Sequence, residues 1–342
     1  MVILGPLRGL DAVRGRVLAA TGLWVRPLLR DRGLRVSVVA SIGIGFAFAA
    51  TVLAPRLLLL YGPLILGVPH LLADVRYLIV QPGAHRAPGF RWVVLPLLAG
   101  LWLWPSLYLG IASVGAAAMV APAIGAGAWR RRGVVLAACA AITLVVAYDE
   151  TASRLAFAHL HNLIAVVFVA LLAVRREHLR RGVVPLALFV TAGVALLFGT
   201  LEPLTEGALA RASRDPSFRE LAWGLAPGED QAVALRIVLF YAFAQSVHYA
   251  SWLRVIPEQA RTRRGVRGFV SSYRALEEEL GAPTLLVAAA VMGGLLLWAA
   301  VDSWGSRDGY LRLAFFHGPL ELAMLAWLFV RGTWLPLEGA PP

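Results

Sequence analysis

Long apolar runs separated by short polar segments make up most of the chain. Between Val36 and Val330, runs of about 18 or more residues that are dominated by Leu, Ala and Gly recur with few charged positions. A helix of about 20 residues crosses the ~30 Å hydrocarbon core of a bilayer and satisfies its own backbone hydrogen bonds. The short alternating segments of a transmembrane barrel do not appear in the sequence. The pattern therefore predicts an all-α, polytopic transmembrane helical bundle.

Ten spans account for these runs. We place them at residues 36 to 54, 57 to 80, 92 to 108, 111 to 128, 134 to 148, 155 to 174, 183 to 200, 232 to 254, 284 to 301 and 310 to 330. The third and fourth spans form one apolar stretch, which we divide near Pro105 because a helix of ~37 residues would be almost twice as long as the bilayer core is thick. The chain is thus divided into a basic interfacial segment (1–34), the bundle (35–331) and a short tail (332–342).

Arginine positions orient the predicted bundle. The Arg-rich segments 1–35, 129–133, 175–181 and 255–281 all fall on one side of a ten-span arrangement. Short cytoplasmic loops are enriched in positive charge, so this side is expected to face the cytoplasm. The segment 201–231 carries six acidic residues against three Arg and is expected outside, where it can form a short interfacial helix or lid. Ten spans then leave both termini in the cytoplasm.

Composition excludes an ordinary soluble domain. Hydrophobic residues make up 59% of the 342 residues and charged residues only 15%, against about 45–50% and ~25% in soluble domains. The net charge of +12 would indicate nucleic acid as the partner of a soluble protein. Here the Arg residues lie between apolar runs, so membrane lipids are the expected partners and nucleic acid is not. The single Cys139 excludes an intramolecular disulfide and a Cys-rich metal site.

Five of the seven His residues lie inside predicted spans: His70, His159, His161, His248 and His317. Ionisable groups within a bilayer are energetically unfavourable and usually face the bundle interior, so each of these His residues is a candidate for a functional site. Two of them have a carboxylate four residues later. These pairs are His70 with Asp74 and His317 with Glu321, and each pair lies on one helical face, where both side chains can reach one metal or the carboxylate can orient the imidazole.

The sixth and eighth spans supply the other imidazoles. A spacing of two places His159 and His161 on nearly opposite helical faces, so we expect one of them to point inward. We favour His159 because Asn162, three residues later, shares its face, and His161 remains the alternative. In the eighth span, a polar and aromatic stripe at helical spacing marks the interior face. It consists of Tyr241, Gln245, His248 and Trp252.

The His-bearing spans are all even-numbered, so they run in the same direction and can line one cavity. Counting from flanking Arg at ~1.5 Å per residue places His70 and His248 roughly 5 Å to the cytoplasmic side of the midplane, and His159 and His317 roughly 7 Å to the outer side. The side chains meet only if the helices are kinked. Pro63, Pro69 and Pro319 are residues at which kinks can occur.

Three or four imidazoles with Asp74 or Glu321 predict a metal centre of iron or zinc, the ions that imidazole favours over magnesium. Iron held by His and carboxylate with open positions activates oxygen, whereas zinc polarises water for hydrolysis. Three alternatives stay open: a hydrogen-bonded network that only locks helix packing, a proton-coupled transporter with the same groups as a relay, and a haem-binding electron carrier.

Two short motifs carry a family resemblance. The pattern GxPHxxxD, formed by Gly67, Pro69, His70 and Asp74, resembles the first motif of the bacterial Brp/Blh-type β-carotene dioxygenases, and FYAFAQSVHYASWL around His248 is similar to the late helix of that family. The resemblance implies His-bound iron with His70, His248 and His159 as ligands. It also implies a location in the bacterial inner membrane and oxidative chemistry on a lipophilic, carotenoid-like or lipid-like substrate. The chain departs from the family at Trp252, where the family carries a second His.

Overall fold

A computed structural model describes residues 4–22, 25–122, 125, 127–175, 179–200, 202–261 and 265–332. Helices connected by short segments form this part of the chain, and no strand occurs in it. Of the predicted tail, residues 333–342 lie outside the described residues. The expected helical class is thus confirmed for the described chain.

Within the described part of the chain, eight helical segments are long and apolar enough to cross a membrane. They are Arg32–Leu53, Pro55–Val80, Ala128–Tyr148, Glu150–Leu171, Arg180–Leu197, Gln231–Ala260, Ala282–Val301 and Ser303–Arg331. Two shorter apolar helices, Phe90–Leu103 and Leu107–Val120, occupy the stretch that we divided in the sequence. The chain leaves the helical conformation between Leu103 and Leu107, so the predicted break at Pro105 is confirmed.

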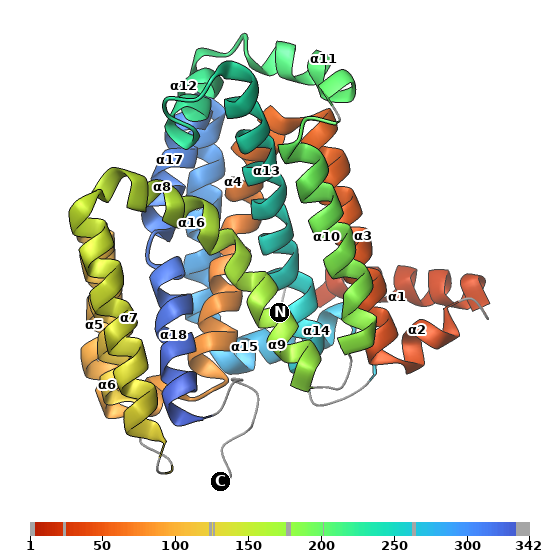
Figure 1. Ribbon diagram of the computed structural model, residues 1–342. Helices are drawn as coiled ribbons and strands as arrows, with labels where there is room; N and C mark the ends of the chain where they lie inside the picture. The colour runs from red at the N-terminus through yellow and green to blue at the C-terminus, as the bar shows by residue number, and fades with distance from the viewer. Residues whose placement is uncertain are drawn as a thin grey trace.

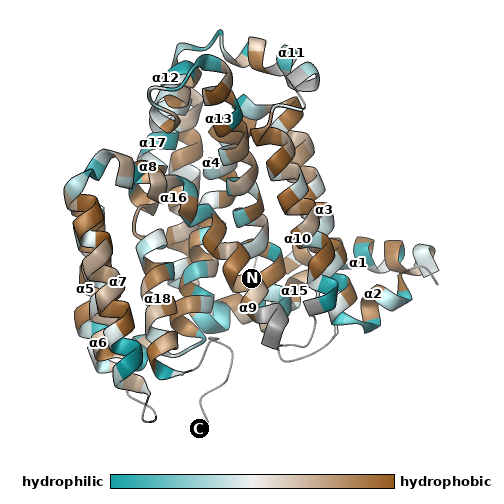
Figure 2. Cartoon of the chain, in the orientation of Figure 1, coloured by the Kyte–Doolittle hydropathy of each residue, from teal (hydrophilic) through white to brown (hydrophobic). Residues whose placement is uncertain are grey.

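Many helices lie side by side in one bundle (Figure 1). Its principal members are α3 (Arg32–Leu53), α4 (Pro55–Asp74), α6 (Leu107–Val120), α10 (Leu179–Leu197), α13 (Gln231–Ala250), α16 (Ala282–Val301), α17 (Ser303–Ala314) and α18 (His317–Arg331). Helix α4 packs on α13, α16 and α17, while α18 packs on α6. Large apolar side chains such as Phe46, Leu144 and Leu297 are exposed on the outside, and Figure 2 shows that hydrophobic residues predominate along these helices. This is the surface expected of helices that face lipid.

Short helices lie at both ends of the bundle. At one end, α11 (Glu202–Ala212) and α12 (Pro216–Leu225) form the segment predicted to be external, which therefore contains two helices (Figure 1). Near the other end are α1 (Leu4–Thr21), α2 (Arg26–Arg30), α14 (Ile256–Ala260) and α15 (Phe269–Leu280). The Asp11 carboxylate accepts hydrogen bonds from the backbone N–H groups of Phe269 and Val270, at 2.8 and 3.1 Å, and so joins α1 to the first turn of α15.

The segment 129–133, expected to be a loop, belongs to helix α7 (Ala128–Tyr148). Arg132 is buried, and its guanidinium donates hydrogen bonds to the carbonyl oxygens of Ala118 and Ala121, at 3.2 and 2.5 Å. These carbonyls lie at the C-terminal end of α6, where backbone acceptors lack helical partners and a cation is favourable. The loop interpretation of this segment was therefore wrong, because one Arg is recruited to bridge two helices.

Gly67 allows α4 to pack closely against α17. A β-carbon at this position would overlap the buried ring of Tyr310, whereas Gly62, also in α4, has open space around it. We expect Gly67→Ala to lower the stability of the protein by about 1–3 kcal/mol, since overpacking displaces side chains from their preferred rotamers. Thermal unfolding of the purified protein in detergent measures the effect, with Gly62→Ala as the matched control. Equal melting temperatures for the two variants would contradict this close approach.

Asp31 connects the beginnings of α3 and α10. Its carboxylate accepts a hydrogen bond from the backbone N–H of Leu34, at 3.1 Å, and another from the guanidinium of Arg181. The Arg181 hydrogen bond is the main reason that the pKa of Asp31 falls from 3.8 to about 2. Because this pKa is lowered by folding, the contribution of Asp31 to stability is present above pH 3.8 and is lost as the pH falls through about 2.

Asp31→Asn is therefore expected to lower the melting temperature near neutral pH and to match the wild type at about pH 2. Melting curves across this range test the expectation. Arg181→Gln is the companion variant and should lose the same pH-dependent contribution to the melting temperature. A constant difference between Asp31→Asn and the wild type at every pH would mean that the ionised carboxylate does not contribute in this way.

Candidate metal centre

Side chains from four separate long apolar segments converge in the centre of the bundle. Helix α4 supplies His70 and Asp74 near its end, and α13 supplies His248. Helix α18 supplies His317 and Glu321 from its first turns, and the 3₁₀ turn η5 (His161–Leu163) supplies His161. The imidazole centroids are 4.8 to 6.0 Å apart for the pairs His70–His248, His70–His317, His161–His317, His161–His248 and His248–His317.

The donor atoms of this cluster are spaced like the ligands of an ion. The Nε2 atoms of His70 and His248 are 3.2 Å apart, Asp74 Oδ2 lies 3.4 Å from His70 Nε2, and Glu321 Oε1 lies 3.6 Å from His248 Nε2. Within each of two overlapping sets, all ligand atoms lie within 4.8 Å of one another: His70, His248 and His317, and His70, Asp74 and Glu321. With metal–nitrogen bonds of ~2.1 Å, two nitrogens separated by the His70–His248 distance subtend about 100° at the metal, an ordinary ligand angle.

Several of these atoms are buried and have no hydrogen-bond partner among the described residues. They are both carboxylate oxygens of Asp74, both of Glu321, His70 Nδ1 and His317 Nε2. The carboxylates of Asp74 and Glu321 are fully buried. Most buried polar groups in proteins have partners, and unpaired charges in a low dielectric are strongly unfavourable. A cation among these donors would satisfy the two carboxylates and His317 Nε2 together, whereas His70 Nδ1 lies on the other edge of a ring whose Nε2 faces the cluster.

Backbone carbonyls set the tautomer of three of the imidazoles. The Nδ1–H groups of His248, His317 and His161 donate to the carbonyl oxygens of Asn162, Ala314 and Ala158, at 3.3, 2.5 and 3.0 Å. A carbonyl oxygen can only accept, so Nδ1 carries the proton and the Nε2 lone pair is available. Metal-binding His residues usually have their second nitrogen held in this way.

Irregular helix geometry accompanies each of the four contributing segments. The π-helices η2 (Val75–Val80) and η6 (Ser251–Val255) begin directly after Asp74 and shortly after His248. The turn η5 interrupts the sixth predicted span, and the regular α-helical hydrogen bonding is interrupted at Phe315 and Phe316, just before His317, where the Phe315 N–H donates to the Arg312 carbonyl. Such interruptions are frequent at functional sites. The His317 ring lies 5.1 and 6.0 Å from those of His70 and His248, although counting along regular helices placed it roughly 12 Å away in depth.

His161, and not the favoured His159, joins the cluster. His159 Nε2 lies 3.0 Å from the carbonyl oxygen of Leu225, to which it donates, and its ring packs on Tyr241. Our choice assumed a regular α-helix through Asn162. Helix α8 (Glu150–Leu160) instead ends before this residue and tightens into η5, which turns His161 inward. Asn162 contributes its backbone carbonyl to His248 rather than marking a shared face with His159.

The predicted interior stripe of the eighth span is buried as expected. Gln245 Nε2 donates to the Tyr241 hydroxyl at 3.3 Å, and Trp252 is fully buried with its ring centroid 6.1 Å from that of His70. Sequence reasoning missed Tyr249, whose ring lies 5.2 Å from that of His70. Its position beside His248 in a polar stretch of a predicted span was the available signal.

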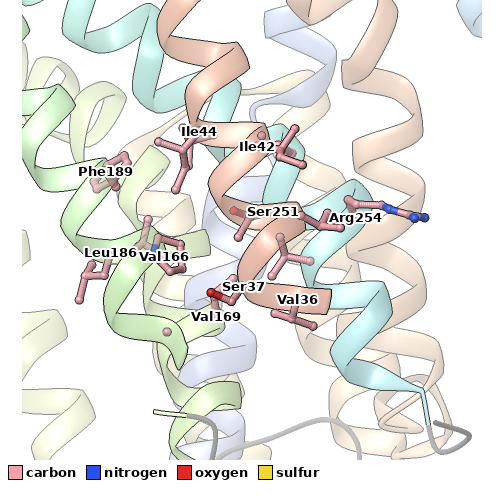
Figure 3. A pocket seen from close by; sticks show the side chains of 18 of the residues that line it. Val36, Ser37, Ile42, Ile44, Val166, Val169, Leu186, Phe189, Ser251 and Arg254 are labelled. Atoms are coloured by element: carbon pink, nitrogen blue, oxygen red, sulfur yellow. The ribbon is translucent and has the colours of Figure 1, made fainter. Parts of the chain in front are cut away.

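An apolar cavity of about 420 Å³ lies beside the helix that carries His248. Residues from α3, α9 (Ile164–Arg175), α10 and α13 line it. Figure 3 shows apolar side chains such as Ile44, Val169 and Phe189 around this space. Val247, which immediately precedes His248, also lines the cavity. A lipophilic molecule in this cavity would therefore lie against α13, the helix that carries His248.

The donors determine what the cluster can do chemically. Neutral imidazole nitrogens and two carboxylates favour a divalent transition metal, whose charge the carboxylates balance. More donors are present than the four that a structural zinc ion uses. Comparisons of the chain with protein-family models, with curated proteins and with solved structures found no match.

Proposed function

We propose that the chain is a ten-span protein of the bacterial inner membrane with both termini in the cytoplasm. Eight long apolar helices and the two shorter ones supply the ten segments. Arg residues of α1, α2 and α15 gather near one end of the bundle, and the acidic segment with α11 and α12 covers the other. The positive-inside rule supports this orientation.

At the centre of the bundle we propose a transition-metal site. Its ligands are drawn from His70, His161, His248 and His317, with Asp74 and Glu321 as ligands or as groups that orient ligands and hold protons. The observation that carries this proposal is the convergence of buried, unpartnered nitrogen and carboxylate donors from separate segments. Iron is favoured over zinc because a mixed set of imidazoles and carboxylates with more than four donors suits a six-coordinate ion.

The proposed activity is that of an oxygenase or a related oxidoreductase acting on a lipophilic substrate from the bilayer. Bound iron with open positions would supply oxygen activation. The apolar cavity beside His248 and the surrounding lipid support a lipophilic substrate. The short-motif resemblance to Brp/Blh-type dioxygenases around His70 and His248 points to the same chemistry.

Elemental analysis of the purified wild-type protein tests this function. We expect stoichiometric iron, removable by a chelator, and no haem absorption band. Ferrous protein treated with nitric oxide should give the paramagnetic signal of a non-haem iron adduct. Protein that contains no transition metal, and takes up none when iron or zinc is added, would rule out the metal centre and with it the proposed activity.

A further inference from the structure

A second cavity, of about 480 Å³, lies between the metal centre and the Arg-rich end of the bundle. Residues of α4, η2, η6, α15 and α1 line it. Its inner wall is apolar and includes Pro69, Ala73, Trp252 and Leu253. Pro69 and Ala73 directly precede His70 and Asp74, so the back of this wall belongs to the metal-binding helix.

The other side of the cavity carries positive charge. Arg76, Arg254, Arg261 and Arg267 line it. Two of these have acidic partners, since Arg76 donates twice to Glu279, at 3.0 and 2.7 Å, and Arg261 pairs with Glu258. Within the described residues, Arg254 and Arg267 have no acidic partner for their guanidinium groups. The cavity therefore has two guanidinium groups available for an anion.

Several positively charged Arg side chains repel one another on this side of the cavity. The pKa of Arg261 falls to about 10, first because the side chain is partly buried and then because Arg35, Arg267, Arg32 and Arg254 repel its charge. Glu258 is shared between Arg35 and Arg261, so it does not balance the whole group. A bound anion would relieve this repulsion and would form charge-assisted hydrogen bonds.

Trp252 borders both the cavity and the metal centre. It lines the inner wall, and its ring centroid is 6.1 Å from that of His70. An apolar chain that lies along the inner wall, starting from the Arg side, thus ends beside Trp252, next to the proposed ligand His70.

We propose that this cavity binds an amphiphile of the inner leaflet that has one oxyanion head and one apolar chain. The head lies at Arg254 and Arg267, and the chain runs along the inner wall toward Trp252. This class of molecule, typified by a long-chain carboxylate, is the substrate class of the metal centre, an assignment that rests on the proposed function. A neutral hydrocarbon would leave both guanidinium groups without a counterion.

Binding of radiolabelled oleate to the full-length protein in phosphatidylcholine nanodiscs tests the site. We expect saturable binding of about one oleate per chain, and about tenfold weaker binding for Arg254→Gln and for Arg267→Gln, as loss of one charge-assisted hydrogen bond predicts. Arg254→Lys, which keeps the charge, should retain most of the affinity. The matched control is Arg130→Gln, since Arg130 is an exposed Arg of α7 outside this cavity.

Two comparisons identify the ligand. Methyl oleate, which lacks the charge, and inorganic phosphate, which lacks the chain, are expected to compete poorly with oleate. Three results would each overturn the proposal. Equal competition by methyl oleate would mean that binding depends on the apolar chain only, and displacement by phosphate alone would mean that the site binds a free anion. An equal loss of oleate binding in Arg130→Gln would mean that binding depends on general surface charge.

The link to the metal centre needs a separate readout. Oleate added to Co²⁺-loaded protein should change its visible absorption spectrum, since the chain ends beside His70. Metal-free His70→Ala protein should still bind oleate, because the oleate site does not need the metal. If the wild type binds oleate but takes up no metal, the proposed function is refuted while the oleate site is retained. Oleate binding with an unchanged cobalt spectrum would refute the substrate assignment alone.

Discussion

His161→Ala is expected to remove most of the bound metal from the purified protein, whereas His159→Ala, two residues earlier, is expected to retain it. The His161 ring lies 5.3 and 5.6 Å from the rings of His317 and His248, and its Nδ1–H is held by a backbone carbonyl. His159 instead donates to Leu225. Loss of one imidazole ligand should weaken metal binding at least as much as removal of a residue that hydrogen-bonds a ligand, which lowers metal affinity by ~10–100-fold.

Metal per chain, measured by elemental analysis after dialysis against a weak chelator, distinguishes the two variants. His70→Ala and His317→Ala should behave like His161→Ala, since each contributes to the same cluster. Thermal unfolding beside each analysis separates loss of metal from loss of fold. Equal metal in His161→Ala and the wild type would remove His161 from the ligand set, and loss in His159→Ala would contradict the placement of the sixth span.

Glu258→Ala should destabilise the protein by about 3 kcal/mol or more, since it leaves a buried guanidinium without its anion. Arg35 Nε and Nη2 donate to Glu258 Oε1, at 2.8 and 2.6 Å, with side chains only 7% and 9% exposed. The pair joins α3 to α14, and Arg35 Nη1 also donates to the carbonyl oxygen of Leu28 at 2.6 Å. Its loss therefore affects the connection between the α2–α3 corner and the rest of the bundle.

Glu150→Ala is the control for this prediction. Glu150 accepts from Arg154 on the surface, with side chains 45% and 47% exposed, and such pairs contribute at most about 1 kcal/mol. Unfolding in increasing proportions of SDS in mixed micelles gives the two free-energy changes. Similar free-energy changes for both variants would mean that the buried Arg35–Glu258 pair contributes no more to stability than an exposed pair. The double variant Arg35→Leu, Glu258→Leu should recover part of the loss, because it removes the buried Arg35 charge but still leaves Arg261 without its Glu258 partner.

Much of the fold was predictable because it follows from local and repetitive properties of the chain. Lengths of apolar sequence predict helices wherever they occur, and the break at Pro105 follows from a missing backbone N–H. The pairs His70–Asp74 and His317–Glu321 were predictable for the same reason, since residues four apart share a helical face. The Arg132 bridge was not predictable, because its acceptors belong to another helix.

By itself, the sequence determined that apolar helices form a bundle and that imidazoles and carboxylates lie within it. Only the tertiary structure decided which of them meet. The choice of His161 over His159 depends on a 3₁₀ turn, and only the packed bundle reveals that the His317 ring lies 5.1 and 6.0 Å from those of His70 and His248. Such departures from regular helix are set by packing between segments distant in sequence, so helical periodicity alone does not reveal them.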